Sequence, residues 1–409
     1  MTLLKKRFAQ LLTEGIHRIR LREHKTVQIV QDELGYSIGR EGGSAIEYWR
    51  KGHLPTSVFE IETLATEMVR RAKLERVWLE DFLACADYPN SDALLMALFP
   101  AVANDAVVAG RQNQVEAVLT SPDQLPPFVI GPPITHPYQF FGRTRILRRL
   151  FNLWQQPPLQ NAALIGPRRS GKTSLLHYLK TITTAPKDHL RPEQKNDWLP
   201  QPQSRGWVFI DFQDSRLGTR SGLMRYILNA LNLKIPEPFN LDRFLDVLSE
   251  GIKQPTVLLL DEIGVALARY PELDDLFWES LRSVATNQVE GKLGFVLTSH
   301  APPDQLAQQS NMGSPFFNIF GYAAHLGPLT DAEAQVLVTS IMASRIGKPI
   351  AESDLAWLLH ESQGWPILLQ ILAREYQFAL EDMEDGEIDD AWREDGLAQI
   401  EPYRYLLTQ

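Results

Sequence analysis

The sequence predicts an α/β protein built on a parallel sheet, preceded by an all-α domain and followed by a helical region. Three observations lead to this prediction. From Phe140 onward, short apolar runs alternate with helical stretches, as in parallel sheets covered by helices. A glycine-rich loop at residues 166–173 joins the first apolar run to a helix. Residues 1–88 are helical in pattern and low in proline.

Proline marks the boundary between the all-α block and the α/β block. The run from Pro122 to Pro137 is rich in proline, which favours extended backbone and indicates a linker. We therefore expect four parts: a helical helix-turn-helix-like domain over 1–88, a proline-rich linker over 89–137, an α/β domain over 138–328, and a helical lid or winged-helix-like domain over 329–409.

Composition is that of a globular protein. The chain has 409 residues, of which 44% are apolar and 22% charged, and it holds no apolar run long enough to span a membrane. Cys85 is the only cysteine, which excludes a disulfide within the chain. Without a signal-peptide pattern at the start, a cytoplasmic location is expected. The net charge is −9, yet residues 1–51 carry ten Lys/Arg against six Asp/Glu.

Residues 166–173 read Gly-Pro-Arg-Arg-Ser-Gly-Lys-Thr, a full match to the phosphate-loop pattern G-x-x-x-x-G-K-[ST]. Apolar residues 162–165 precede the loop and a helical stretch follows it. In such a loop, backbone N–H groups and a helix N-terminus bind phosphate oxygens. Lys172 is expected to reach the β- and γ-phosphates, and the Thr173 hydroxyl to bind Mg²⁺. The loop predicts a nucleoside triphosphate site.

A second apolar strand, residues 256–260, ends in Asp261 and Glu262. Asp261 is expected at the carboxyl end of this strand, where it can hold Mg²⁺. Glu262 is suited to polarise the water that attacks the γ-phosphate, so Lys172 and Glu262 are the predicted catalytic residues. The pair predicts hydrolysis in addition to binding. No Asn/Thr-Lys-x-Asp element for guanine follows the loop, which favours ATP over GTP.

Three more strands are expected, at residues 207–211, 293–298 and 322–326. Thr298, Ser299 and His300 follow or end the second of these, either as sensors of the γ-phosphate or simply as polar residues at a strand end. Residues 185–204 are rich in proline and charge and are expected to form a surface loop.

The α/β block resembles the signal-transduction ATPases with numerous domains, known as STAND ATPases, especially their prokaryotic and archaeal-type branches. Phe140-Phe141-Gly142-Arg143 is similar to an element that lies near the adenosine in that family. Leu326-Gly327-Pro328-Leu329 with Glu333-Ala334 is similar to the family's junction into its lid, and Gly364-Trp365-Pro366 to its G-x-P motif. The resemblance implies a P-loop NTPase fold of the ASCE or AAA-like kind and a nucleotide-controlled switch.

The loop and the resemblance together give the predicted cofactor-binding residues: Arg143, Gly166, Pro167, Arg168, Arg169, Ser170, Gly171, Lys172, Thr173, Ser174, Ser299 and Pro366.

Residues 26–55 resemble a Cro/repressor-type helix-turn-helix. Thr26 is expected to cap the first helix, and residues 46–52 to form the second, with Ile46 and Trp49 in the core. Outward-facing side chains of the second helix and the turn would contact DNA. The predicted DNA-binding residues are Arg40, Ser44, Tyr48, Arg50 and Lys51.

We expect a cytoplasmic ATPase switch that binds ATP or ADP with Mg²⁺, forms homo-oligomers on ATP binding, and contacts double-stranded DNA or a protein partner but no membrane. Two alternatives remain open. One is a protein-interaction or defence adaptor without DNA binding. The other is an AAA+-type regulator of DNA transposition, which would need an arginine acting in trans, with Arg282 and Arg345 as candidates.

Overall fold

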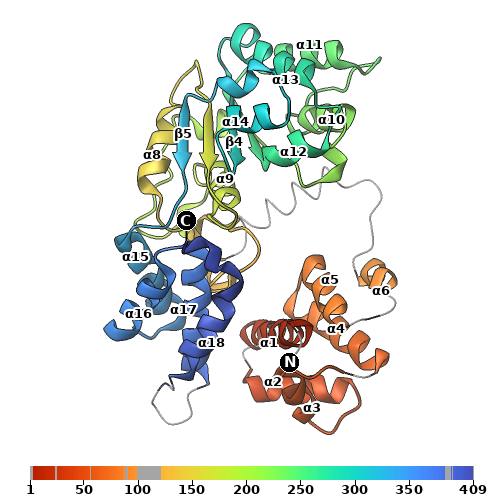
Figure 1. Cartoon of the computed structure of the whole chain (residues 1–409), viewed down its shortest axis with the longest axis vertical. Helices are drawn as coiled ribbons and strands as arrows, with labels where there is room; N and C mark the ends of the chain where they lie inside the picture. The colour runs from red at the N-terminus through yellow and green to blue at the C-terminus, as the bar shows by residue number, and fades with distance from the viewer. Residues whose placement is uncertain are drawn as a thin grey trace. The chain divides into compact units, whose positions relative to one another are not determined.

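The computed structural model describes residues 3–98, 121–382 and 388–408, apart from His24, Thr56, Asp87, Pro89, Asn90 and Asp389. The chain divides into two compact units, Met1–Asp105 and Ala106–Gln409 (Figure 1). The second unit contains both the α/β domain and the C-terminal helices.

The first unit is helical throughout its described part. Its helices are α1 (Leu3–Glu23), α2 (Val27–Ser37), α3 (Ser44–Arg50), α4 (Val58–Ala72), α5 (Arg76–Cys85) and α6 (Ser91–Leu98). Their apolar faces meet in one core, in which Phe8, Leu12 and Leu64 are fully buried. Leu94 and Leu95 of α6 belong to the same core, so the packed unit extends beyond residue 88.

Helices α2 and α3 are joined by a close-packed turn over residues 38–43. The Thr26 hydroxyl accepts the N–H of Ile29 at 3.3 Å and so caps α2, as the sequence predicts. Gly35 approaches the turn so closely that a Cβ atom there would lie 2.0 Å from the carbonyl oxygen of Gly42. Ile46 and Trp49 of α3 are buried in the core. Only a glycine at position 35 permits this packing.

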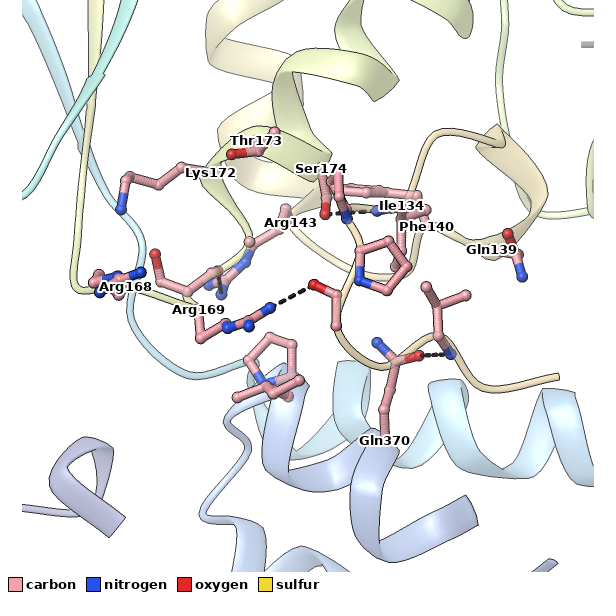
Figure 2. A pocket seen from close by; sticks show the side chains of 18 of the residues that line it. Ile134, Gln139, Phe140, Arg143, Arg168, Arg169, Lys172, Thr173, Ser174 and Gln370 are labelled. Atoms are coloured by element: carbon pink, nitrogen blue, oxygen red, sulfur yellow. Dashed lines mark hydrogen bonds between the residues drawn. The ribbon is translucent and has the colours of Figure 1, made fainter. Parts of the chain in front are cut away.

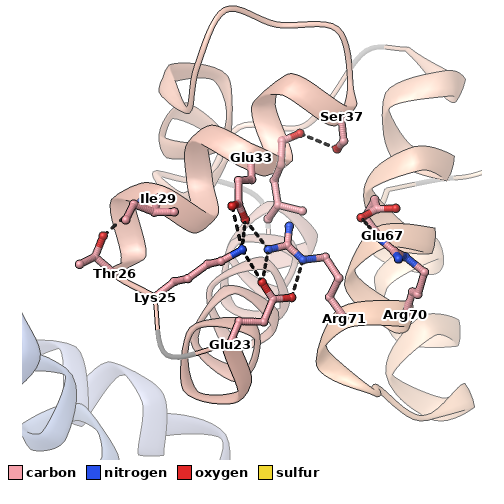
Figure 3. Close-up of polar contacts among 10 residues, drawn as sticks. Glu23, Lys25, Thr26, Ile29, Glu33, Ser37, Glu67, Arg70 and Arg71 are labelled. Atoms are coloured by element: carbon pink, nitrogen blue, oxygen red, sulfur yellow. Dashed lines mark hydrogen bonds and ion pairs between the residues drawn. The ribbon is translucent and has the colours of Figure 1, made fainter.

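Four charged side chains tie α1, α2 and α4 together (Figure 3). Arg71 binds both carboxylate oxygens of Glu23, at 2.8 and 2.7 Å, and contacts Glu33 at 2.5 Å. Lys25 joins the same two glutamates at 2.8 Å each. The network connects helices that are distant in sequence. Arg71 lies in the last turn of α4, and Glu33 lies within α2.

The second unit is built on a five-stranded sheet in the order β2-β3-β4-β1-β5, with every neighbouring pair parallel. Its strands are β1 (Ala162–Ile165), β2 (Gly206–Asp211), β3 (Thr256–Asp261), β4 (Leu293–Ser299) and β5 (Tyr322–His325). These are the five strands predicted from the apolar runs, with ends that differ by at most one residue. Strand β4 lies between β1 and β3, so the phosphate loop and the acidic strand end are not on adjacent strands.

Both faces of the sheet are covered by helices, which explains why its central strands are continuously apolar. Along β3, Val257 and Leu259 enter one core with α8 (Thr144–Asn152) and α9 (Lys172–Thr181). Leu258 and Leu260 point to the opposite core. That core is covered by helices α10 (Arg220–Ala230), α11 (Leu241–Gly251), α12 (Ile263–Arg269), α13 (Asp275–Ser283) and α14 (Pro303–Gln309).

After residue 329 the described chain consists of helices joined by short loops and contains no described strand. Its main helices are α15 (Asp331–Ile341), α16 (Glu352–Ser362), α17 (Pro366–Glu381) and α18 (Ala391–Ile400), with a π-helical turn η8 (Met342–Ile346) and a 3-10 segment η9 (Glu401–Leu406). Helix α17 is the centre of this helical part, since most of its first eight residues are buried. We keep the name lid, from the prediction for 329–409, for this part. Within the described part of the chain, no helix is long and apolar enough to cross a membrane.

The segment 185–204, expected to be a plain surface loop, is anchored to the α/β domain by Arg191. This guanidinium is buried, donates hydrogen bonds to the carbonyl oxygens of Tyr138 and Phe140, and stacks 3.6 Å from the centre of the Phe141 ring. The loop therefore packs against the segment that leads into the phosphate loop. The proline and charge content of residues 185–204 does not predict this anchoring, because the contacts depend on one side chain, that of Arg191.

Candidate nucleotide site

The phosphate loop takes its shape from two glycines. Strand β1 ends at Ile165 and helix α9 begins at Lys172. A Cβ atom on Gly166 would lie 2.7 Å from the carbonyl oxygen of Leu326, so a larger residue would push the loop off the neighbouring segment. Gly171 has a φ of 92°, a conformation that glycine adopts without steric cost. The loop thus delivers the N-terminus of α9 to the carboxyl edge of the sheet.

Lys172 is the first residue of α9, and its side chain contacts the loop that precedes this helix. Its ammonium group donates to the carbonyl oxygens of Gly166 at 2.8 Å and Pro167 at 2.9 Å. The side chain is buried, and this burial lowers the pKa of Lys172. A buried ammonium gains most from an added negative charge, because attraction between charges is stronger away from bulk water.

Asp261, at the end of β3, faces the first turn of α9. Its Oδ2 accepts the hydroxyl of Thr173 at 2.8 Å, so the two predicted magnesium ligands are in contact. Burial raises the pKa of Asp261 to about 6. A carboxylate and a hydroxyl are oxygen ligands of the kind that Mg²⁺ prefers, and a buried carboxylate favours a bound cation. This pair therefore fits a magnesium ion that also binds phosphate oxygens.

Glu262 follows Asp261 in a left-handed conformation, with a φ of 54°. The hydroxyl of Thr298, at the end of β4, accepts the N–H of Glu262 at 2.8 Å and donates to Oδ1 of Asp261 at 2.6 Å. Thr298 is fully buried. This bond supports an otherwise unfavourable backbone conformation and turns the Glu262 side chain to the cavity.

The loop, the acidic residues and the lid line one cavity of about 360 Å³ (Figure 2). Of the predicted cofactor-binding residues, nine line it: Arg143, Arg168, Arg169, Ser170, Gly171, Lys172, Thr173, Ser174 and Pro366. Asp261 and Glu262 line it as well. Residues scattered over more than 200 positions of the sequence thus meet in one place.

Three predicted residues lie outside the cavity wall. Gly166 and Pro167 act through their carbonyl oxygens, which hold Lys172. Ser299 is buried and donates its hydroxyl to the carbonyl oxygen of Ala301 at 2.7 Å, a local contact at the strand end. His300 is exposed and also does not line the cavity. Of the three polar residues after Leu297, Thr298 contacts the acidic pair.

Arg143 joins two motifs that the sequence analysis treated separately. Its guanidinium donates to the carbonyl oxygens of Gly327 and Pro328, in the junction before the lid. It also approaches the carbonyl oxygen of Ser170 in the phosphate loop, at 3.4 Å. Arg143 therefore connects the loop to the start of the lid, a structural role that the prediction of nucleotide contact did not include.

Asp211 and Gln213 also line the cavity, although neither was among the residues predicted for the site. Asp211 ends β2 and pairs in register with Asp261, so the two carboxylates lie at the ends of adjacent strands. Its carboxylate accepts the N–H of Gln213 at 2.8 Å, and burial raises the pKa of Asp211. The signal was present, since β2 is an apolar run that ends in Asp, as β3 does.

A further wall of the cavity, not predicted from the sequence, is the strap, which we define as residues 121–134 of the proline-rich linker. Val129, Gly131, Pro132, Pro133 and Ile134 line the cavity. Arg169 of the phosphate loop donates to the carbonyl oxygen of Gly131, and the Ser174 hydroxyl accepts the N–H of Ile134 at 3.0 Å (Figure 2). The segment expected to be a spacer is a wall of the site.

Arg345, a candidate for an arginine acting in trans, is hydrogen-bonded to the strap. Its guanidinium donates to the carbonyl oxygens of Pro122, Asp123 and Leu125, and its side chain is only 10% exposed. It is therefore not presented to another subunit. Arg282, the other candidate, lies on α13 and does not line the cavity.

In the first unit, the predicted DNA-binding residues separate into two groups. Ser44, Tyr48 and Lys51 are exposed and follow helical spacing on one face of α3. Arg40 instead pairs with buried Glu60 at 2.5 Å. Arg50 donates to the hydroxyl of Thr13 in α1 at 3.3 Å.

The exposed face of α3 is nearly neutral. Lys51 pairs with Glu47 at 2.7 Å, and Tyr48 stacks on His53 with ring centres 3.7 Å apart. Of the five predicted DNA-binding residues, Arg40 and Lys51 are thus paired with acids, Arg50 is bonded to Thr13, and Tyr48 is stacked on His53.

Several solved structures are similar in fold. The Walker-type ATPase of Pyrococcus abyssi has 17% identity and a TM-score of 0.46, over 68% of this chain and 78% of that one. Cdc6p of Pyrobaculum aerophilum has 20% identity and a TM-score of 0.43, over 63% and 67%. The RuvB Holliday junction branch migration motor of Thermotoga maritima has 16% identity and a TM-score of 0.41, over 64% and 70%. No protein-family model and no curated protein matches the sequence.

Proposed function

We propose that this chain binds and hydrolyses ATP with Mg²⁺. One observation carries the proposal: Lys172, Thr173 and Asp261 meet at the carboxyl edge of a parallel sheet, within the cavity formed by the phosphate loop. Loop N–H groups and Lys172 would bind the β- and γ-phosphates. Thr173 and Asp261 would hold Mg²⁺, which supplies charge neutralisation on the phosphate oxygens.

Hydrolysis requires a base near the γ-phosphate, and Glu262 is the proposed one. Its side chain faces the cavity beside Asp261, and the Thr298 hydroxyl holds its backbone. In this position the carboxylate would orient a water molecule and accept its proton during attack on the γ-phosphate. Lys172 would stabilise the negative charge on the transferred group.

We further propose that the nucleotide acts as a switch. The cavity takes its walls from the phosphate loop, the strap and the lid, where Leu337 and Pro366 contribute. A ligand that contacts all three would stabilise one arrangement of them over another, and loss of the γ-phosphate would change that preference. Such a switch would control homo-oligomer formation on ATP binding, or contact of the first unit with double-stranded DNA or a protein.

The helix-turn-helix-like first unit supports a second candidate function, a protein-interaction adaptor. Arg40 and Arg50 are engaged within the unit, and α3 exposes Tyr48 beside the Glu47–Lys51 pair. Tyr36 and Phe59 are also exposed, at 64% and 63%. Exposed aromatic side chains with few free cations suit a protein surface better than a phosphate backbone.

Phosphate release tests the ATPase proposal. Wild type, Lys172→Ala and Glu262→Gln are compared with Mg²⁺ and ATP. We expect Lys172→Ala to lose binding, and Glu262→Gln to bind ATP while turnover falls by about a hundredfold or more. Equal rates in all three proteins would remove the assignment.

Salt-dependent binding of the full chain to duplex DNA separates DNA binding from the adaptor function. A DNA-binding unit should bind even a non-specific duplex at low salt, with affinity that falls as salt rises. Lys51→Ala should then weaken binding to every sequence. If no binding appears at low salt with or without ATP, the adaptor is the better description.

A further inference from the structure

Gln370 is a polar side chain on the buried, mainly apolar helix α17. It is 6% exposed and lines the cavity. Pro366 and Gln370 are four residues apart and so occupy the same face of α17, with Ile367 beside them. The helix face that brings Pro366 to the cavity therefore brings an amide group as well.

The orientation of this amide is fixed by the strap. Gln370 Oε1 accepts the N–H of Val129 at 2.8 Å (Figure 2). A backbone N–H can only donate, so the oxygen of the amide must face Val129 and the nitrogen must face away. Within the described part of the chain, no hydrogen bond from Gln370 Nε2 is found. This nitrogen is not among the fully enclosed polar atoms that lack a partner, so it is open to the cavity, where a bound ligand can offer it an acceptor.

The position of Gln370 in the cavity indicates what that acceptor is. Lys172, Thr173 and Asp261 define the end that would hold the triphosphate and metal. Gln370 belongs to the lid wall of a cavity whose lining also includes the apolar residues Val129, Ile134, Leu337 and Ile367. Apolar walls with a few placed polar groups suit a flat heteroaromatic ring.

We propose that Gln370 Nε2 donates a hydrogen bond to a ring nitrogen of the purine base, which makes Gln370 a specificity-determining residue of the site. The inference rests on the proposed ATP site and adds the group that reads the base. Adenine offers three unprotonated ring nitrogens as acceptors: N1, N3 and N7. The Val129 N–H holds the amide ready for this contact, so that little rotamer freedom is lost on binding.

Base analogues test the contact directly. Affinities of the full chain for ATP and for 1-deaza-, 3-deaza- and 7-deaza-ATP are measured by calorimetry with Mg²⁺. Each analogue replaces one ring nitrogen by C–H and leaves the triphosphate unchanged. We expect one of the three to bind about five- to twentyfold more weakly, the loss expected for one hydrogen bond from a largely buried side chain.

Two variants separate base reading from a purely structural role. Gln370→Glu keeps an oxygen that can accept the Val129 N–H but removes the Nε2 donor, and Gln370→Met removes both contacts at similar side-chain length. In both we expect weaker ATP binding and no remaining difference between ATP and the sensitive analogue. If Gln370 only positions the strap, Gln370→Glu will bind like wild type and keep the same sensitivity.

The outcomes distinguish this inference from the proposal on which it rests. Wild type that binds ATP but binds all three analogues equally well overturns the role of Gln370 and leaves the ATP site standing. Tighter ATP binding by Gln370→Glu also overturns it, because the base would then present a donor and not an acceptor. Failure of wild type to bind ATP at all removes the proposed function itself.

Discussion

Thr298 donates its hydroxyl proton to Asp261 across the strand boundary, at 2.6 Å, and accepts the N–H of Glu262 at 2.8 Å. A single buried hydroxyl thus orients both the proposed metal ligand and the backbone of the proposed base. Thr298 itself does not line the cavity, so it acts through its two neighbours. The acidic pair of β3 depends on a side chain of β4.

Replacing Thr298 by valine should disable hydrolysis more than nucleotide binding. Valine keeps the shape but leaves the Glu262 N–H unpaired and takes a donor from Asp261, at a stability cost of about 1–3 kcal/mol. We expect turnover to fall at least tenfold while ATP affinity changes less, as measured by phosphate release and calorimetry. Thr298→Ser keeps the hydroxyl and should retain most activity. An unchanged turnover in Thr298→Val would contradict the positioning role.

Local patterns predict the parts of the site that lie within one strand–loop–helix unit. The loop before α9 and the acidic end of β3 are both short segments whose local amino-acid sequence determines their geometry. Parallel strands end at a common edge, so the meeting of Thr173 with Asp261 follows from the two patterns together. Asp211 could have been found by the same reasoning.

Long-range contacts explain what the sequence could not predict. The strap has no regular period of its own, and Arg345 and Gln370, which hold it, lie more than 200 residues further along the chain. Gln370 is the one polar residue in the apolar first half of α17, residues 366–373, and the apolar pattern does not indicate a role for it. Arg40 likewise turns inward because it pairs with Glu60, and no local sequence pattern indicates that Glu60 is buried.

Arg345→Met should release the strap from the lid. Methionine keeps the aliphatic stem but removes every donor to the carbonyl oxygens of Pro122, Asp123 and Leu125. We expect faster protease cleavage within 121–128 and weaker ATP binding, because the strap forms one wall of the cavity. Arg243→Met is a suitable control, since that arginine is 60% exposed and forms only a long surface pair. Equal cleavage rates in both variants would show that Arg345 does not hold the strap.

His177 should make the second unit sensitive to acid. Burial, with a smaller contribution from Lys180, lowers the pKa of His177 to about 4, below its usual 6.5. The unfolded chain therefore takes up a proton between pH 6.5 and 4 that the folded chain resists. Stability from this source is complete above pH 6.5 and is lost as the pH falls to 4, on the order of 2 kcal/mol.

His177→Phe removes this titration and can keep the stacking on Phe209, whose ring centre lies 4.4 Å away. In thermal unfolding between pH 7 and 4, the variant should lose less stability than wild type. His360 has an 82% exposed side chain, so His360→Gln should follow the wild-type curve and serves as the control. A His177→Phe curve that runs parallel to wild type would refute the assignment.

Arg71 should contribute far more to the stability of the first unit than its neighbour Arg70 does. The Arg71 side chain is 11% exposed and binds Glu23 and Glu33, so Arg71→Met removes the main partner of Glu23 and one of the two partners of Glu33 (Figure 3). Removing one partner of such a pair costs about 2–4 kcal/mol. Arg70 is 67% exposed and pairs only with Glu67, so Arg70→Met should cost about 0.5 kcal/mol or less.

The pH dependence of the difference in stability between Arg71→Met and Arg70→Met provides a second check. Arg71 holds the pKa of Glu23 at about 2, below its usual 4.5. The stabilisation is therefore present above pH 4.5 and is lost as the pH falls toward 2. Hydrogen exchange of α1, α2 and α4 should show faster opening in Arg71→Met than in Arg70→Met at pH 7, with the gap narrowing in acid. A gap that stays constant down to pH 2 would mean that Arg71 stabilises the helices by packing and not by its charge.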